Sequence, residues 1–145
     1  MALPQQRYLY TDSKYEYTLE IIFTETPLKA LKGLYKKWDI DEDLIDGDAY
    51  TVVCENKAGD YIDNSRYGLI FSYRCLTPNI IAHECTHLAA FILEARNIDL
   101  PGKDNKYENM CWVVGHLTEM VTNLAEKLNI PIYKSSFPSK LKKLG

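Results

Sequence analysis

This chain of 145 residues is short of three features that would place it in a familiar class. No stretch approaches the roughly 20 consecutive apolar residues that a membrane-spanning helix needs. The net charge of −3 gives no general attraction to nucleic acid. The four cysteines form no C-x-x-C pair, which argues against a redox pair or a zinc site built on thiolates. We therefore expect no membrane span, and we do not expect nucleic acid as a partner.

Residues 1–7 lack the apolar core of a secretory signal, and this predicts a cytoplasmic protein. In that compartment the cysteines are expected to stay reduced, as small buried side chains. Near the other end, lysines occur without acids, which is typical of a flexible basic tail over about residues 134–145. A regulator that binds nucleic acid through this tail is the least favoured function.

The length suits one compact domain, residues 1–145, and is too short for two well-packed ones. Hydrophobic residues make up 46% of the chain and charged residues 26%, which is enough for a globular core. Alternating and helical apolar patterns predict an α+β fold, with a short mixed or antiparallel sheet packed on two long helices. The expected strands are 17–23, 50–54 and 67–73, and the expected helices are 28–38, 78–97 and 105–128.

The expected helix 78–97 contains the motif His83-Glu84-Cys85-Thr86-His87. Imidazoles four residues apart lie on one face of a helix, where both can bind a single metal ion, and Zn²⁺ is the expected ion. Glu84 would then reach a water on the metal rather than the metal itself, which is the arrangement of zinc-dependent peptidases. In the alternative, the two histidines are merely polar residues on the surface of an amphipathic helix.

The motif needs a helix, and both ends of one are marked in the sequence. Thr77 supplies a hydroxyl N-cap, and Pro78 suits the first helical position. Apolar residues then recur at helical spacing up to Asn97, which tolerates the left-handed conformation of a helix end. Since the chain has only three histidines, the presence of two of them in this register favours a metal site.

A catalytic zinc site needs a third protein ligand, and Glu108 is the candidate. It lies near the start of the second long helix, which a loop joins to the first, as in an antiparallel pair. Gly115 would return to nearly the same helical face, where its missing side chain lets another helix approach closely. In the alternative, Gly115 is a tolerated core glycine without a functional meaning. Alternatively, Asn105-x-x-Glu108 is a capping box, in which the carboxylate bonds backbone and Asp104 becomes the third ligand.

These residues resemble the HExxH zincins that use glutamate as third ligand, in particular small phage and prophage proteins assigned as metallopeptidases. In that group the motif is followed by an apolar helix, a short loop and the pattern E-x-x-A-Y-L-x-G-Y-L. This chain matches the pattern at Glu108, Gly115 and Leu117. Both family tyrosines are replaced here, so a phenol that could stabilise an oxyanion is missing at those positions. The departures are Cys111, Trp112, Val113 and His116.

The resemblance implies that Glu108 is the third zinc ligand, that Glu84 is the general base, and that the protein works in a bacterial or phage-infected cytoplasm. It also implies that strand 67–73, just before the motif helix, is a sheet edge that pairs with an extended peptide substrate. The alternative for this strand is an ordinary interior position, because Leu69 to Phe71 is continuously apolar.

The sequence thus predicts a zinc-dependent metallopeptidase in which His83, His87 and Glu108 hold Zn²⁺ and Glu84 takes the proton from the attacking water. The substrate would be a peptide or a protein. The alternative function is a metal-stabilised phage or prophage protein that serves a structural or interaction role without cleaving anything.

Overall fold

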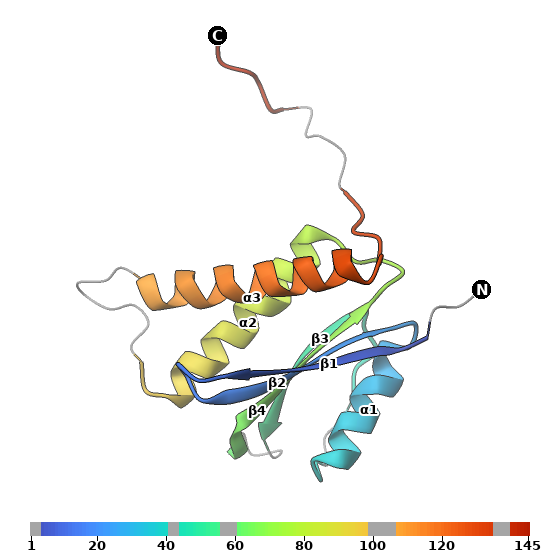
Figure 1. The fold of residues 1–145 in the computed structure, drawn as a ribbon, viewed down its shortest axis with the longest axis vertical. Helices are drawn as coiled ribbons and strands as arrows, with labels where there is room; N and C mark the ends of the chain where they lie inside the picture. The colour runs from blue at the N-terminus through green and yellow to red at the C-terminus, as the bar shows by residue number, and fades with distance from the viewer. Residues whose placement is uncertain (1–3, 41–43, 56–60, 99–106, 135–139) are drawn as a thin grey trace.

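The computed structural model describes residues 4–40, 44–55, 61–98, 107–134 and 140–145. These residues form one mixed four-stranded sheet and three helices, which confirms the expected α+β class (Figure 1). The sheet has the order β1-β2-β4-β3, with β2 and β4 parallel and the other neighbours antiparallel. The elements are β1 (Gln6–Asp12), β2 (Tyr17–Thr24), α1 (Pro27–Lys37), β3 (Ala49–Glu55), β4 (Tyr61–Ser72), α2 (Pro78–Ala95) and α3 (Glu108–Lys127).

The sheet carries helices on both faces. One face is covered by α1, whereas α2 and α3 lie in contact with each other over the opposite face (Figure 1). Side chains of β2 point alternately to the two faces of the sheet, so this strand contributes to both hydrophobic cores. Leu19 and Ile21 pack with α2 and α3, and Ile22 packs with α1. The buried residues of α2 are Ile81, Cys85, Leu88, Ala89, Ile92 and Leu93. Among the described residues, no helix is long and apolar enough to cross a membrane.

The cysteines are all free, as expected, but they differ in burial. Cys54 and Cys85 are buried, Cys75 is half-buried and Cys111 is exposed, so the expectation of buried thiols is confirmed for the first two only. Part of the expected basic tail, residues 135–139, lies outside the described residues. Residues 140–145 are exposed and belong to no helix or strand.

Two glycines in regular structure have different surroundings. A Cβ on Gly68 in β4 would lie 2.9 Å from Leu34 Cδ1 and 3.3 Å from Val52 Cβ, so α1 lies close to the sheet there. A Cβ on Gly115 in α3 would meet no neighbouring atom within 4 Å, and this position is exposed. The expected close approach of another helix at Gly115 is therefore wrong, and Gly115 is not a core glycine either.

We expect Gly115→Ala to raise the free energy of unfolding by about 1 kcal/mol, because alanine removes the entropic penalty of a helical glycine. Gly68→Ala should lower it by about 1 to 3 kcal/mol, since Leu34 or the strand must move to admit the methyl group. Chemical denaturation of the two variants measures both effects. Shifts of the same sign would contradict the surroundings assigned to these glycines.

Arg96, directly after α2, fixes the end of that helix to the sheet. Its guanidinium donates to the backbone oxygens of Tyr15 at 2.6 Å, of Glu16 at 2.8 Å and of Asn64 at 2.6 Å. Tyr15 and Glu16 belong to the turn between β1 and β2, and Asn64 belongs to β4. Because the guanidinium is planar and its donors point in fixed directions, these bonds set the position of α2 along the sheet.

Candidate metal centre

The motif lies in the middle of α2, whose ends are marked by the residues that the sequence indicated. The Thr77 side chain caps the helix by accepting a hydrogen bond from the Ile80 N–H at 3.1 Å, and Pro78 follows at the first helical position. Beyond the other end, Asn97 has a φ of 56°, which is the expected left-handed conformation. The helix prediction for the motif is therefore confirmed.

His83 and His87 project from the exposed side of α2, and their Nε2 atoms lie 3.2 Å apart. Two nitrogen ligands of a tetrahedral zinc ion, each about 2.0 to 2.1 Å from the metal, lie about 3.3 Å from each other. The observed distance between the two nitrogens is close to that value. The two imidazoles are therefore spaced to share one metal ion.

Glu84 lies beside this pair but is more sheltered. Its side chain is 12% exposed, compared with 64% for His83. Glu84 Oε2 lies 3.8 Å from His83 Nε2, and Glu84 Oε1 accepts a hydrogen bond from Thr51 Oγ1 at 3.0 Å. Thr51 Oγ1 also lies 2.9 Å from the backbone oxygen of Glu84. The carboxylate is thus held at one oxygen, and its other oxygen is near an imidazole.

Thr51 was not among the residues that the sequence indicated, although a signal was present. Alternate residues of β3 face different cores, with Val52 on the α1 side and with Ala49 and Val53 on the α2 side. Thr51 shares the face of Ala49 and Val53, so a hydroxyl stands where the strand pattern expects an apolar side chain. A polar group on an inward strand face needs a hydrogen-bond partner, and here the partner is Glu84.

Cys85, inside the motif, points into the core instead of toward the imidazoles. It is fully buried, and Thr118 of α3 is near its thiol. Burial raises the pKa of the Cys85 thiol to about 12. A thiol with so high a pKa is protonated at neutral pH, so Cys85 serves as a small core residue and not as a nucleophile.

Glu108 lies away from the imidazoles, because it is the exposed first residue of α3. The start of α3 is beside the end of α2, since Tyr15 binds Arg96 through its carbonyl and Asn109 through its hydroxyl. His87 precedes Arg96 by more than two helical turns, about 13 Å along the axis. Among the described residues, no three His, Cys, Asp or Glu side chains are grouped to hold a metal ion. The structure therefore does not bring Glu108 to the histidine pair.

The capping box expected around Glu108 is also not formed. The N-cap of α3 is Tyr107, in the left-handed conformation with a φ of 70°, and its own side chain makes no capping hydrogen bond. Glu108 is thus the first helical residue instead of the third after an asparagine cap, so the capping-box prediction is wrong. Asn105 and the alternative ligand Asp104 lie outside the described residues.

The sheet edge beside the motif is β3 and not strand 67–73. That strand belongs mostly to β4, which pairs with β2 on one side and with β3 on the other. The prediction that it is an edge is wrong, and the interior alternative is confirmed. Within the described part of the chain, β3 pairs with β4 alone, and Thr51 places β3 next to Glu84.

His116, the remaining histidine, belongs to a separate cluster. Its Nε2 lies 3.0 Å from the hydroxyl of Tyr10, which donates to Asp12 at 2.7 Å. Its ring stacks on Trp112 with 5.1 Å between the ring centroids. These contacts join α3 to β1, so His116 links two elements of the fold and is not part of the metal centre.

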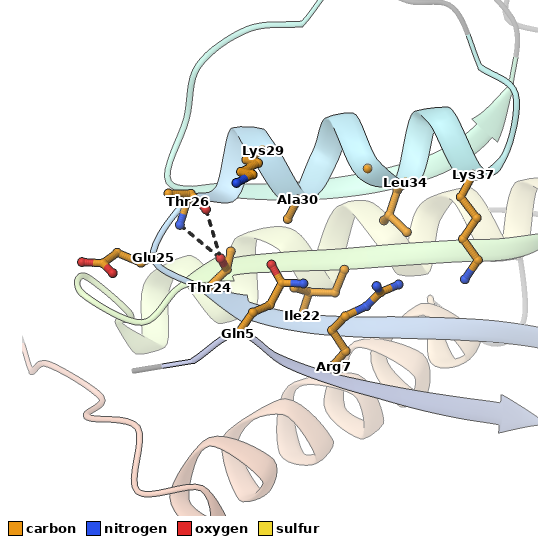
Figure 2. Close-up of a pocket in the computed structure, with 11 residues that line it drawn as sticks. Gln5, Arg7, Ile22, Thr24, Glu25, Thr26, Lys29, Ala30, Leu34 and Lys37 are labelled. Atoms are coloured by element: carbon orange, nitrogen blue, oxygen red, sulfur yellow. Dashed lines mark hydrogen bonds between the residues drawn. The ribbon is translucent and has the colours of Figure 1, made fainter. Parts of the chain in front are cut away.

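A groove of about 530 Å³ lies on the other face of the sheet, between α1 and the strands β1 and β2 (Figure 2). None of its lining residues comes from α2, so the groove is separate from the candidate metal centre. Arg7 and Lys37 line it, and both bind the carboxylate of Glu20. Burial opposes the ionisation of Glu20, but the bonds from Lys37 and Arg7 outweigh burial and hold its pKa below the usual value. These charges are thus already paired within the chain.

The candidate centre thus consists of the motif residues His83, Glu84 and His87, with Thr51 of β3 bonded to Glu84. Comparison with known proteins contributes nothing further, because no protein-family model, no curated protein and no solved structure matches this chain significantly.

Proposed function

We propose that this protein is a zinc-dependent peptidase with His83 and His87 as metal ligands and Glu84 as general base. One combined observation carries the proposal. Two imidazole nitrogens lie 3.2 Å apart, and a sheltered carboxylate oxygen lies 3.8 Å from one of them. The histidine pair alone would favour metal binding without chemistry. The oriented carboxylate beside it is what favours hydrolysis.

Each of these side chains has a defined part in the proposed reaction. His83 and His87 would hold a zinc ion, which would supply a Lewis acid to polarise the peptide carbonyl and to lower the pKa of water. Glu84 Oε2 accepts a proton from the attacking water and returns it to the leaving amine nitrogen. The low exposure of Glu84 supports this role, because the electrostatic interactions of a sheltered carboxylate are screened less by water.

An extended peptide is the substrate class that fits the neighbourhood of the motif. An edge strand such as β3 can add another strand through backbone hydrogen bonds. Thr51 places the middle of β3 next to Glu84, so a peptide paired with β3 would pass close to the carboxylate. Alternate side chains of such a peptide would point toward the metal centre and away from it, which provides a basis for sequence preference.

Metal analysis and a cleavage assay on one preparation test the proposal. We expect about one zinc ion per chain, together with cleavage of an unfolded protein such as reduced casein. A chelator should abolish the cleavage, and added zinc should restore it. Cleavage that persists in a zinc-free preparation would contradict the proposal.

A non-catalytic, metal-stabilised protein is the second candidate, and one observation favours it. Both imidazoles are exposed, and the described residues provide no third side chain that joins them around a metal. Chelation separates the two functions. A metal needed mainly for folding lowers the melting temperature strongly when it is removed, whereas removal of a catalytic metal costs activity first.

Glu108→Gln tests the third ligand that the family resemblance implies. We expect this variant to bind zinc as tightly as the wild type, because the start of α3 lies beside the far end of α2. Competition with a fluorescent zinc chelator measures the affinity. Glu119→Gln, at another exposed position of α3, is the matched control. Weaker zinc binding by the Glu108 variant alone would mean that the family ligand set applies and that the start of α3 moves when the metal binds.

A further inference from the structure

We infer that Thr51 is a positioning residue, which holds Glu84 in the orientation that a general base at this site requires. The inference rests on the proposed function of Glu84. The Thr51 hydroxyl oxygen lies 3.0 Å from Glu84 Oε1 and 2.9 Å from the backbone oxygen of the same residue. One hydroxyl of β3 therefore contacts both the main chain and the side chain of Glu84.

The two contacts have different requirements. A hydroxyl has one proton to donate, and both acceptors here belong to Glu84. A bond to the backbone oxygen would form with any residue at position 84, and it ties β3 to α2. A bond to Oε1 forms only if an acceptor stands at the end of that side chain. The second contact therefore orients the carboxylate and is not needed to join the strand to the helix.

Orientation matters because a glutamate side chain on a helix has several freely rotating bonds. Fixing such a side chain costs conformational entropy, and an ordered partner can offset this cost. Thr51 is an ordered donor, since a β-branched residue in a strand has a restricted χ1. With Oε1 held by Thr51, Oε2 lies 3.8 Å from His83 Nε2. A shift of about 1 Å at a reacting group can cost about 100-fold in rate, so this restraint has chemical value.

Two substitutions at position 51 separate orientation from packing. Thr51→Val keeps the shape and removes the hydroxyl, and we expect kcat to fall about 10- to 100-fold with KM and zinc affinity unchanged. Thr51→Ser keeps the hydroxyl and should recover most of the lost rate. Thr18→Val, at a half-buried position of β2, is the matched control and should behave as the wild type. Wild-type kcat in Thr51→Val, or a serine variant as slow as the valine variant, would overturn the inference.

A second measurement does not depend on activity. Melting temperatures of the zinc-free protein are compared for the wild type, Thr51→Val, Glu84→Ala and the double variant. We expect Thr51→Val to lower the melting temperature less in the Glu84→Ala background, because one of the two contacts is already lost there. Equal shifts in both backgrounds would show that Thr51 does not hold the Glu84 side chain. A wild type that cleaves nothing would overturn the proposed function, and the comparison of shifts would still decide the role of Thr51.

Discussion

Glu84→Gln is expected to leave zinc bound and to lower kcat by about 10²- to 10⁴-fold, the usual contribution of a general base. The amide has the same shape as the carboxylate, and its oxygen can still accept the hydrogen bond from Thr51. It cannot take up the proton of an attacking water. The imidazoles of His83 and His87 are untouched, so metal content should not change. Initial rates at saturating substrate, together with metal analysis, measure the two quantities.

Glu94→Gln is the matched control for this variant, because Glu94 lies on the same helix, is exposed, and undergoes the same chemical change. It should retain both zinc and full activity. If Glu84→Gln cleaved peptide as fast as the wild type, Glu84 would have no part in the proton transfer. If it lost zinc as well as activity, Glu84 would act as a metal ligand instead of a base.

Replacement of either motif histidine by alanine is expected to remove zinc binding. Each imidazole provides one of two nitrogens that lie 3.2 Å apart, so neither can compensate for the loss of the other. Loss of a residue that contacts only a metal ligand lowers metal affinity by about 10- to 100-fold. Loss of a ligand itself should lower the zinc affinity by more. The zinc-free fold should keep its stability within about 0.5 kcal/mol, because both side chains are exposed. Zinc titration and thermal melts measure these effects.

His116→Ala is the control for loss of an imidazole elsewhere in the chain. It removes the contacts of His116 with Tyr10 and Trp112, so it should lower the melting temperature. Its zinc affinity should equal that of the wild type. This is the reverse of the pattern expected for His83→Ala and His87→Ala. If both motif variants kept their zinc, the metal would have to bind at another place.

Local signals predicted the elements that carry the motif. The start and the end of α2 follow from Thr77, Pro78 and Asn97, because helix caps depend on a few neighbouring residues. The positions of β2, α1 and β3 were also close to those expected from their apolar patterns. By contrast, β1 was not expected. Most of its residues are exposed at the sheet edge, so burial imposes little alternation on them.

Positions that depend on packing between distant segments were not predicted. Antiparallel pairing of the two long helices is expected to bring Glu108 to the histidines, whereas α3 starts beside the end of α2. The apolar run from Leu69 to Phe71 did indicate an interior strand, and the family resemblance pointed to an edge instead. The contact of Thr51 with Glu84 joins residues 33 apart in the chain, and only the folded sheet brings them together.

The bonds of Arg96 to the sheet also affect the position of Glu84, although the two residues are far apart on α2. Glu84 precedes Arg96 by twelve residues, which corresponds to about 18 Å along the helix axis. Glu84 lies opposite Thr51 only if α2 has the right position along the sheet. The bonds from Arg96 to three backbone carbonyls determine that position. Substitution of Arg96 is therefore expected to displace Glu84 from Thr51 without replacing any side chain of the candidate centre.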